Sequence, residues 1–373
     1  MRALVTGGAG FIGSHTTDLL LERGYEVRIL DSLQERVHPN GPPSYLPDAA
    51  ELVVGDVSDR DALGGALEKC DVVLHLAAYQ DYQPDFSRFV HTNTESSALI
   101  FELVVSDPAR FPVQKVIFAS SQAVSGEGKF RCPDDGTVTY PKPRTLEQLE
   151  ARKWDHSCPS CGGPVEPMLL DEETCSNPHT AYGVSKYAIE LLAFTLGRRY
   201  GIATAAMRYT YVQGPRNSFY NAYSGIARRF ALRLRAGLPP VCYEDGRQLR
   251  DYVNVRDVAR ANLIALEHPG SDGLALNVGG GRAVSVLEFA QMMVETTGSD
   301  LEPTVPGEFR LGDTRHTISD ISRMEGLGWT PEVPVEENVR EYLEWLDTQR
   351  VPTDHLLTAE SEMTAQGVVR RTG

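Results

Sequence analysis

The chain has 373 residues, of which 41% are hydrophobic and 23% charged, proportions typical of a globular protein with a sizeable core. Its formal net charge of −15 at pH 7 argues against a nucleic-acid partner, because binding a phosphate backbone requires a basic surface. No stretch approaches the ~20 apolar residues of a membrane span, and glycines interrupt the N-terminus before a signal-peptide core forms, so we expect a cytoplasmic protein without a membrane partner.

The N-terminal segment predicts a strand, a glycine-rich turn and a helix. The apolar run Arg2–Val5 leads into three glycines, and a helical pattern follows from Phe11 to Leu21. Glycines at such a turn let the backbone approach a pyrophosphate, and the N-terminus of the helix behind them offers N–H groups and a positive dipole end. The turn predicts a dinucleotide site that includes Gly7, Gly10, Phe11, Ile12 and Gly13.

A second apolar run, Tyr25–Leu30, ends at Asp31 and is followed by Ser32. A carboxylate at the end of the second strand suits the 2′-hydroxyl of an adenosine ribose and repels a 2′-phosphate, so the sequence favours NAD over NADP. The glycines alone are compatible with an ordinary loop, but strand, helix and acid together favour nucleotide binding.

Strand-like and helix-like runs alternate through the first half, which predicts an α/β protein with a Rossmann-like, doubly wound parallel sheet. We place Asp56 and Val57, after the third strand, over the adenine, and expect the small residues of Leu76, Ala77 and Ala78, after the fourth, to let the backbone lie close to the cofactor. The expected strands are 2–5, 26–30, 51–54, 72–75, 115–119 and 203–209.

We expect the NAD-binding Rossmann domain to comprise residues 1–126 and 177–212. An insertion at 127–176, rich in proline, glycine and charge, separates them and is too long for an ordinary connection. Residues 213–350 are expected mainly in a smaller substrate-binding lobe, with some segments returning to the Rossmann domain. Residues 351–373 lack a periodic apolar face and predict a tail with at most one short helix.

Four of the six cysteines lie in the insertion, which indicates metal binding more than disulfides in a reducing compartment. The segment from Cys158 to Gly163 contains Cys161 and has the form of a zinc knuckle, with two thiolates on a tight turn. Cys132 precedes it and Cys175 follows, so four thiolates can close a structural zinc site. Asp135, His156 and His179 are alternatives for the fourth ligand, and a loop of reduced thiols is the alternative to metal.

Tyr182 and Lys186 are four residues apart at the start of the helix predicted at Ala181–Tyr200, so their side chains share one face. A tyrosine is a poor base at neutral pH, but an adjacent ammonium favours its phenolate. Ser121 ends a predicted strand, where its hydroxyl can bond the same substrate oxygen that Tyr182 deprotonates. A solvated helix with one aromatic residue is the alternative for the tyrosine–lysine pair alone.

These motifs, in this order, resemble the extended short-chain dehydrogenase/reductase family, and within it the nucleotide-sugar epimerases and dehydratases. The resemblance covers about residues 1–347. The insertion and the segment Gly312–His316 are similar to those of dTDP-L-rhamnose 4-epimerase-like proteins. The matching segments also include Asn93, Phe118–Ser121, Tyr182–Lys186, Arg208-Tyr209, Gly214-Pro215, Arg250–Val253 with Asp257, and Gly312-Asp313.

The resemblance implies a catalytic set of Ser121, Tyr182 and Lys186, tightly held NAD and a nucleoside-diphosphate sugar substrate. It implies that Asn93, Ser120, Tyr182 and Lys186 also contact the cofactor. It further implies a homodimer formed through helices at Asn93–Leu103 and Ala181–Leu196. The implied substrate contacts are Asp81, Ser121, Gln122, Tyr211, Arg250, Arg310 and Arg315.

The reaction is predicted from two positions after the catalytic hydroxyl. Dehydratases of the family carry an Asp-Glu pair there and decarboxylases a glutamate, whereas this chain has Gln122 and Ala123. Elimination needs an additional acid or base, and 4-epimerisation does not, so we predict a nucleotide-sugar 4-epimerase. A dehydratase or decarboxylase that uses another carboxylate, such as Glu127, is the first alternative. A non-catalytic NAD sensor is the second.

Overall fold

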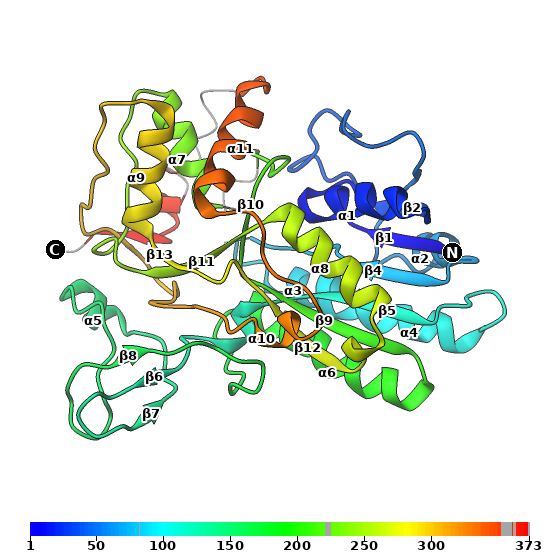
Figure 1. The fold of residues 1–373 in the computed structure, drawn as a ribbon, viewed down its shortest axis with the longest axis horizontal. Helices are drawn as coiled ribbons and strands as arrows, with labels where there is room; N and C mark the ends of the chain where they lie inside the picture. The colour runs from blue at the N-terminus through cyan, green and yellow to red at the C-terminus, as the bar shows by residue number, and fades with distance from the viewer. Residues whose placement is uncertain (82, 221–224, 352–359, 361–362, 372–373) are drawn as a thin grey trace.

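The computed structural model describes residues 1–81, 83–220, 225–351, 360 and 363–371. Its centre is a seven-stranded parallel sheet in the order β12-β9-β5-β4-β1-β2-β3 (Figure 1). Most of these strands are short, apolar and buried, as in sheets covered by helices on both faces. The strands are β1 (Arg2–Thr6), β2 (Glu26–Asp31), β3 (Glu51–Val54), β4 (Val72–His75), β5 (Lys115–Ser121), β9 (Ala203–Tyr209) and β12 (Leu274–Val278).

Helices cover both faces of this sheet, which confirms the predicted doubly wound fold. On one face, α1 (Phe11–Glu22) and α8 (Val255–Glu267) pack together over a core that includes Trp329. On the other face lie α2 (Arg60–Leu67), α4 (Ser96–Ser106) and α6 (Ala181–Tyr200). Before α4 the chain forms α3 (Phe86–Phe89) and a π-helical segment, η1 (Val90–Glu95).

Local sequence sets the ends of α6. The side chain of Thr180 accepts a hydrogen bond from the backbone N–H of Gly183, which caps the helix. Gly201 ends the helix with a φ of 71°, a left-handed conformation that glycine adopts without steric cost. The helix therefore begins and ends at the residues that the sequence predicts.

The insertion forms a small antiparallel sheet in the order β7-β6-β8, followed along the chain by the return to α6. Its elements are β6 (Phe130–Arg131), β7 (Val138–Thr139), α5 (Leu146–Glu150) and β8 (Glu166–Pro167). Figure 1 shows it projecting away from the central sheet, below the C-terminal lobe.

The C-terminal lobe has its own core, built on the three-stranded sheet β10-β11-β13. Residues 213–350 do not all belong to it, because α8, β12, the short η3 (Pro269–Ser271) and α10 (Ser322–Glu325) pack on the central sheet. The lobe contains β10 (Tyr211–Gln213), α7 (Ile226–Arg235), β11 (Leu249–Asn254), β13 (Ala283–Ser285), α9 (Val286–Thr297) and α11 (Val335–Asp347).

The C-terminal tail is more ordered than its composition predicts. In its described part, β15 (Val369–Arg370) pairs antiparallel with β14 (Phe309–Arg310), and Met363 is buried. Glu360 forms ion pairs with α7 arginines. Isolated apolar residues anchor this segment, and isolated residues produce no periodic pattern in a sequence. Within the described residues, no helix has the length and hydrophobicity needed to traverse a membrane.

Candidate active site

The glycine turn lies where the strand order reverses, between β1 and β4. Gly7 has a φ of +68°, and a Cβ there would lie 2.8 Å from the Cα of Ala77. A Cβ on Gly13 would lie 2.1 Å from the carbonyl oxygen of Gly7. The turn is therefore packed tightly against both α1 and the loop after β4. In the described chain no side chain caps the N-terminus of α1 at Gly10, so its first N–H groups can meet an anion.

Asp31 ends β2, and its carboxylate connects the glycine turn with the loop after β2. Its Oδ2 accepts a hydrogen bond from the Ala9 N–H at 3.0 Å, and its Oδ1 accepts one from Leu33 N–H at 2.9 Å. Ser32 follows and is half-buried. After β3, Val57 is buried whereas Asp56 is exposed and accepts a bond from the Ser58 N–H. These placements agree with a cofactor lying across the carboxyl ends of β1, β2 and β3.

Tyr182 and Lys186 share one face of α6, with the Lys186 ammonium nitrogen 5.7 Å from the centre of the tyrosine ring. The Nζ of Lys186 donates a hydrogen bond to the carbonyl oxygen of Ala119, at 2.8 Å, which connects α6 to β5. Lys186 is almost fully buried, and this desolvation lowers its pKa to about 7. The pair therefore lies near the end of β5, with a lysine whose pKa burial brings close to neutral pH.

Ser121 lies at the end of β5, and the 3₁₀ turn η2 (Gln122–Ser125) follows directly. The Oγ of Ser121 accepts a hydrogen bond from the Ala123 N–H. A Cβ on Gly183 would lie 2.7 Å from the Ala123 carbonyl, so the first turn of α6 packs directly on η2. The structure thus brings the tyrosine helix and the serine turn together. The Oε1 of Gln122 is buried and has no hydrogen-bond partner among the described residues, which makes it available to a ligand.

Ser120, which was expected to contact the cofactor, is bonded to a side chain of α6. Its hydroxyl donates to the Oε1 of Glu190 at 2.5 Å, and Glu190 also forms a bidentate pair with Arg208 at 2.8 Å. All three side chains are buried. Sequence reasoning missed Glu190, although it lies one helical turn after Lys186 on the same face, and an acidic residue at that spacing was a usable signal.

Asn93 is also a positioning residue here. Its side chain accepts a bond from the Tyr79 N–H at 2.7 Å and donates to the Tyr79 carbonyl and the Ser185 hydroxyl. Both amide hydrogens are therefore used within the protein, since the NH₂ group has two donors. Asn93 lies in the π-helical η1, and it holds the loop after β4 against α6.

Asp81, an expected substrate contact, has partners for its carboxylate within the protein. It is buried, forms an ion pair with Arg36, and accepts hydrogen bonds from the Tyr79 hydroxyl and the Gln83 N–H. The pairing with Arg36 connects the loop after β2 with the loop after β4. Because the two residues are far apart in sequence, no local pattern indicated this pair. Ala78, just before this loop, is exposed.

Of the three arginines expected to contact the substrate, two remain candidates for binding an anionic group. The guanidinium of Arg250, on β11, lies 5.1 Å above the ring of Tyr211 and donates to the carbonyls of Thr314 and Arg315. Arg310 is half-buried, with its Nε 3.8 Å from Asp313. These contacts place two cations beside the 313–315 loop, and Arg250 lies next to Tyr211.

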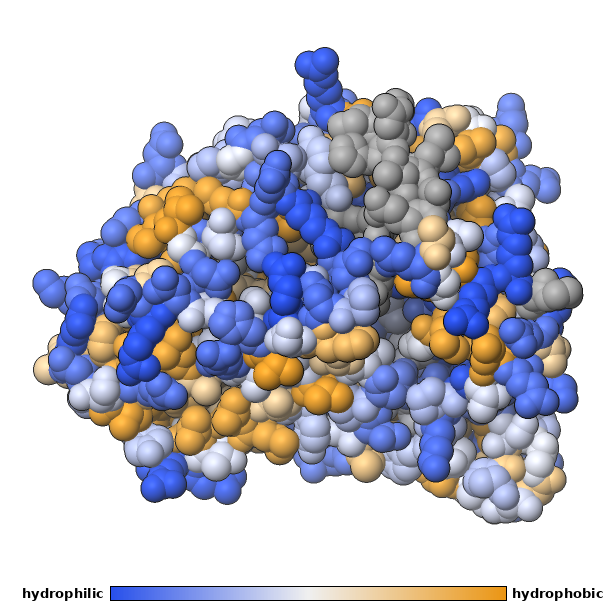
Figure 2. Space-filling model, turned by 180° about the vertical axis from the view of Figure 1, so that it is seen from behind, coloured by the Kyte–Doolittle hydropathy of each residue, from blue (hydrophilic) through white to orange (hydrophobic). Residues whose placement is uncertain are grey.

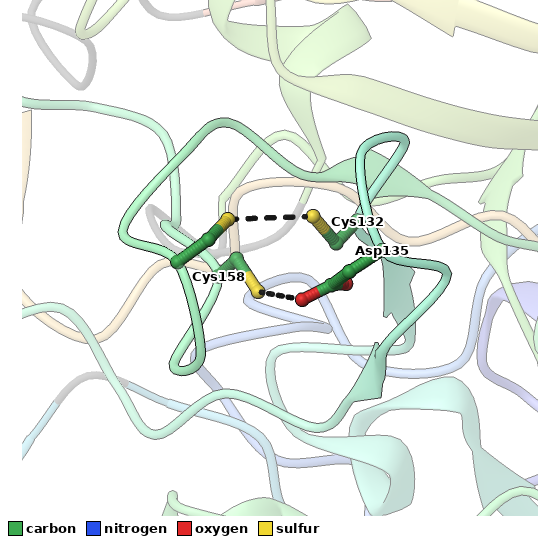
Figure 3. A group of neighbouring side chains, drawn as sticks. Cys132, Asp135 and Cys158 are labelled. Carbon is green, nitrogen blue, oxygen red and sulfur yellow. Dashed lines mark hydrogen bonds between the residues drawn. The ribbon is translucent and has the colours of Figure 1, made fainter.

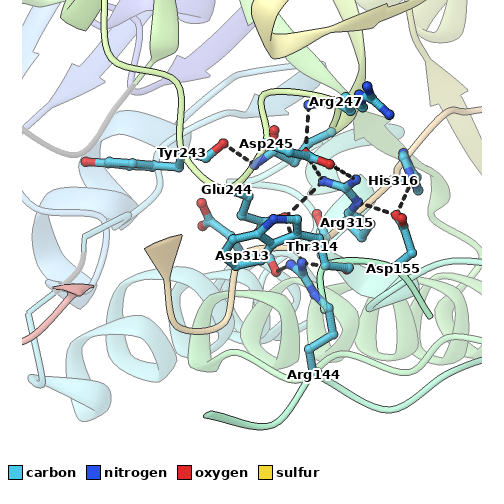
Figure 4. Close-up of polar contacts among 12 residues, drawn as sticks. Arg144, Asp155, Tyr243, Glu244, Asp245, Arg247, Asp313, Thr314, Arg315 and His316 are labelled. Carbon is cyan, nitrogen blue, oxygen red and sulfur yellow. Dashed lines mark hydrogen bonds and ion pairs between the residues drawn. The ribbon is translucent and has the colours of Figure 1, made fainter. Parts of the chain in front are cut away.

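Arg315 is the exception, because carboxylates already surround it. Its Nη1 and Nη2 pair with Asp245 at 2.6 and 2.8 Å, its Nε donates to Asp155 at 2.7 Å, and Glu244 lies 3.1 Å away (Figure 4). The Arg315 side chain is only 2% exposed. It therefore connects the insertion to the C-terminal lobe and is not positioned to bind a diphosphate.

The insertion brings together Cys132, Asp135, Cys158 and Cys161, whose ligand atoms all lie within 4.8 Å of one another (Figure 3). Cys175 is outside this group: it is exposed, and its Sγ faces the carbonyl of Ser176. Cys175 follows the return of the chain to the main body at Leu170, which bonds to Ile318. The fourth member of the group is Asp135, one of the alternatives that the sequence offered to Cys175.

Sequence and structure comparisons place this site within a known class. The chain belongs to the NAD dependent epimerase/dehydratase family, whose pattern matches residues 3–153 and 157–279. This confirms the predicted resemblance to nucleotide-sugar epimerases of the extended short-chain dehydrogenase/reductase type.

Particular relatives sharpen the comparison. The dTDP-L-rhamnose 4-epimerase of Burkholderia thailandensis is 33% identical to this chain, over 92% of this chain and 94% of that protein. The crystal structure of a UDP-glucose 4-epimerase from Thermotoga maritima with UDP-glucose matches with a TM-score of 0.76 at 30% identity, covering 93% and 99% of the two chains. That of the Thermus thermophilus UDP-glucose 4-epimerase with NAD matches at 0.72 and 26% identity, covering 94% and 100%.

Proposed function

We propose that this protein is an NAD-dependent nucleotide-sugar 4-epimerase. The observation that carries the proposal is the packing of the first turn of α6, which carries Tyr182 next to Lys186, against the turn that follows Ser121. This contact lies at the carboxyl edge of the sheet, and positions 122 and 123 carry no carboxylate. The family membership and the relatives named as 4-epimerases support the same activity.

The glycine turn and Asp31 fit NAD. Gly7 and Gly13 let the turn pack closely on the loop after β4 and on α1, and the first N–H groups of α1, without a side-chain cap, can bind a pyrophosphate. The Asp31 carboxylate lies at the end of β2, where it can accept from a ribose 2′-hydroxyl. When bound, NAD would accept the hydrogen of sugar carbon 4 as hydride and return it to the opposite face.

The chain's own residues move and hold the proton. Tyr182 takes the proton of the 4-hydroxyl and gives it back after the 4-keto sugar has turned over in the site. A charged Lys186 favours the phenolate of Tyr182, and Ser121 hydrogen-bonds the same substrate oxygen. The Ala119 carbonyl holds the Lys186 amine in place through the 2.8 Å hydrogen bond.

A lyase reaction is less well supported by the surroundings of Glu127. This carboxylate is 1% exposed, lies 3.1 Å from the His156 Nε2 and accepts a hydrogen bond from the Arg315 N–H. Although burial alone raises the pKa of a carboxyl, these partners together hold the pKa of Glu127 below its usual value. The Glu127 carboxylate is therefore engaged by the insertion and by the 315 segment, which does not favour it as the additional acid of an elimination.

The substrate class that we propose is a nucleoside-diphosphate sugar. Arg250 and Arg310 provide cations for the diphosphate on the lobe, and Gln122 provides a buried amide near the reacting sugar. The relatives act on sugars attached to different nucleotides, dTDP and UDP, so both belong in a substrate panel.

The test is incubation of the purified protein with that panel, with products identified by NMR and mass spectrometry. An isomer of unchanged mass supports 4-epimerisation, whereas loss of water or carbon dioxide would establish a lyase. The Tyr182→Phe variant should lose turnover by at least ~100-fold while NAD remains bound. Full activity of that variant would show that Tyr182 is not part of the mechanism. If no sugar nucleotide reduces bound NAD in a single turnover, the alternative of a non-catalytic NAD sensor would be favoured.

We also infer that a second copy of the chain packs on α4 and α6. Apolar side chains gather along the lower left of the molecule seen from behind (Figure 2). Val184 and Leu191, seven residues apart on α6, are 50% and 52% exposed, and Val90 and Val105 lie exposed near and on α4. Light scattering should find a dimer, and the Leu191→Glu variant should weaken it. Val305 is exposed on the C-terminal lobe, so the Val305→Glu variant is the control and should leave the dimer intact. A monomeric wild-type protein would disprove this inference.

A further inference from the structure

The insertion contains the same five-residue turn twice. Cys132-Pro133-Asp134-Asp135-Gly136 and Cys158-Pro159-Ser160-Cys161-Gly162 share cysteine, proline and glycine at the same positions. Both glycines have a φ of +74°. In each turn the glycine N–H donates to the carbonyl of the first cysteine, at 3.0 and 2.9 Å, and that cysteine N–H donates to the residue after the glycine, at 2.9 and 2.8 Å.

Asp135 therefore occupies in the first turn the position that Cys161 occupies in the second. The two turns face each other, and Figure 3 shows the side chains of Cys132, Asp135 and Cys158 directed into a common centre. The Sγ atoms of Cys132 and Cys161 are 3.6 Å apart, and Cys158 Sγ lies 3.9 Å from the Asp135 Oδ2.

These separations match the edges of a zinc tetrahedron. With Zn–S of about 2.3 Å and Zn–O of about 2.1 Å, a tetrahedral ion places two sulfurs about 3.8 Å apart and a sulfur and an oxygen about 3.6 Å apart. Thiolates are soft ligands that favour zinc over magnesium or calcium. Four protein ligands leave no open position for water or substrate, which is the arrangement of a structural site.

We propose that this chain holds one structural zinc ion bound by Cys132, Asp135, Cys158 and Cys161. The paired turns supply two ligands each, and Asp135 replaces the fourth cysteine of a symmetric site. Cys175 takes no part.

The zinc would act on the sugar site through the strands that carry its ligands. Phe130 and His156 each lie two residues before a ligand cysteine, and their rings contact each other, with centres 5.1 Å apart. Phe130 also lies against His316, and His156 lies against Glu127, whose carboxylate holds the Arg315 N–H. The Arg315 carbonyl in turn accepts a hydrogen bond from Arg250.

The consequence of these contacts for activity rests on the proposed function. The zinc ion would keep the 313–316 loop and Arg250 in place to bind the diphosphate of the sugar nucleotide. The glycine turn lies on the central sheet and takes no part in this series of contacts. Loss of zinc should therefore raise the KM for the sugar nucleotide and leave NAD binding unchanged.

The experiment measures metal in the full-length protein, purified under reducing conditions, by elemental analysis, and the absorption of the cobalt-substituted form. We expect one zinc per chain and charge-transfer absorption from three thiolates. Asp135→Asn should lose zinc to a chelator at least ~10-fold faster, and Asp135→Cys should retain it more firmly and show a fourth thiolate. Asp134→Asn and Cys175→Ser are the matched controls and should behave as wild type.

Three outcomes would overturn the site: wild-type protein without zinc after purification and reconstitution, a Cys132–Cys161 disulfide in the reduced preparation, or zinc loss in Cys175→Ser but not in Asp135→Asn. The activity arm is separate. If zinc is present and its removal changes NAD affinity but not the KM of the sugar, the link to Arg250 is wrong while the metal site stands. Absence of epimerase activity would refute the proposed function and leave the metal readout unaffected.

Discussion

At the residue scale, the most informative side chain is Lys186, because one short hydrogen bond and complete burial determine its chemistry. Its Nζ donates a hydrogen bond to the Ala119 carbonyl, and burial lowers its pKa to about 7. A neighbouring phenolate or a cofactor hydroxyl would restore part of the lost solvation. The sequence predicted which residue assists Tyr182, whereas its burial follows from the packing of α6 on β5.

The Lys186 pKa gives a stability prediction with a definite sign. Between pH 7 and the ordinary lysine pKa of 10.5, the unfolded chain binds more protons than the folded one, so the free energy of unfolding of wild type rises with pH. Lys186→Met lacks this penalty. The variant should therefore be more stable than wild type at pH 6, by a few kcal/mol at most, with the advantage shrinking toward pH 10.

Urea unfolding of the NAD-free protein at pH 6, 8 and 9.5 measures this difference. Lys142→Met, at an exposed position, is the control and should follow the wild-type slope. An identical slope for Lys186→Met would show that the amine is not desolvated.

At the element scale, short turns rather than long helices determine the site. The glycine turn between β1 and α1 and the turn η2 after β5 are where backbone atoms come so close that side chains are excluded. The sequence predicted the first from its spacing. The contact between Gly183 and Ala123 was not predicted, because it joins segments separated by the whole insertion.

Gly13→Ala tests the glycine turn. Alanine is normally preferred to glycine in a helix by about 1 kcal/mol, but here its Cβ would lie 2.1 Å from the Gly7 carbonyl oxygen. We expect the turn to open, with NAD affinity falling at least ~10-fold and stability decreasing. Gly65→Ala, on α2 with nothing within 4 Å of its Cβ, should instead stabilise by about 0.5–1 kcal/mol. Fluorescence titration and urea unfolding measure both; unchanged NAD affinity in Gly13→Ala would contradict the packing.

At the scale of the whole molecule, a buried layer of charges joins the insertion to the C-terminal lobe. Arg144 and Arg315 both contact Glu244, and the side chains of Arg144 and Glu244 are each 1% exposed. Asp155 adds a further contact, and its bonds with His316 and Arg315 hold its pKa well below the usual range. This layer attaches the insertion firmly to the C-terminal lobe.

Removal of the Arg315 cation separates a structural role from a substrate contact. Arg315→Met leaves Asp245 and Glu244 without their shared cation, so we expect a loss of about 3–5 kcal/mol in unfolding free energy. Arg310→Met, at a half-buried position, should cost little stability and raise the KM for the sugar nucleotide. Chemical unfolding and steady-state kinetics on both variants check this. If the Arg315→Met protein has normal stability but a high KM for the sugar nucleotide, Arg315 contacts the diphosphate after all.

The amino-acid sequence by itself determined the parallel sheet, because that depends on local period. It also predicted the NAD turn and the Ser121, Tyr182 and Lys186 set, because these depend on short spacing near the end of a strand or the start of a helix. Only the tertiary structure decided which charged groups are free. Asp81 and Arg315 were reasonable substrate contacts by position, but distant partners, Arg36 and Asp245, neutralise them. Asp135 lies beside the three cysteines because residues 132–136 and 158–162 form the same turn, a repeat that is visible in the sequence. Burial and pairing depend on residues brought together by folding, and no local pattern contains that information.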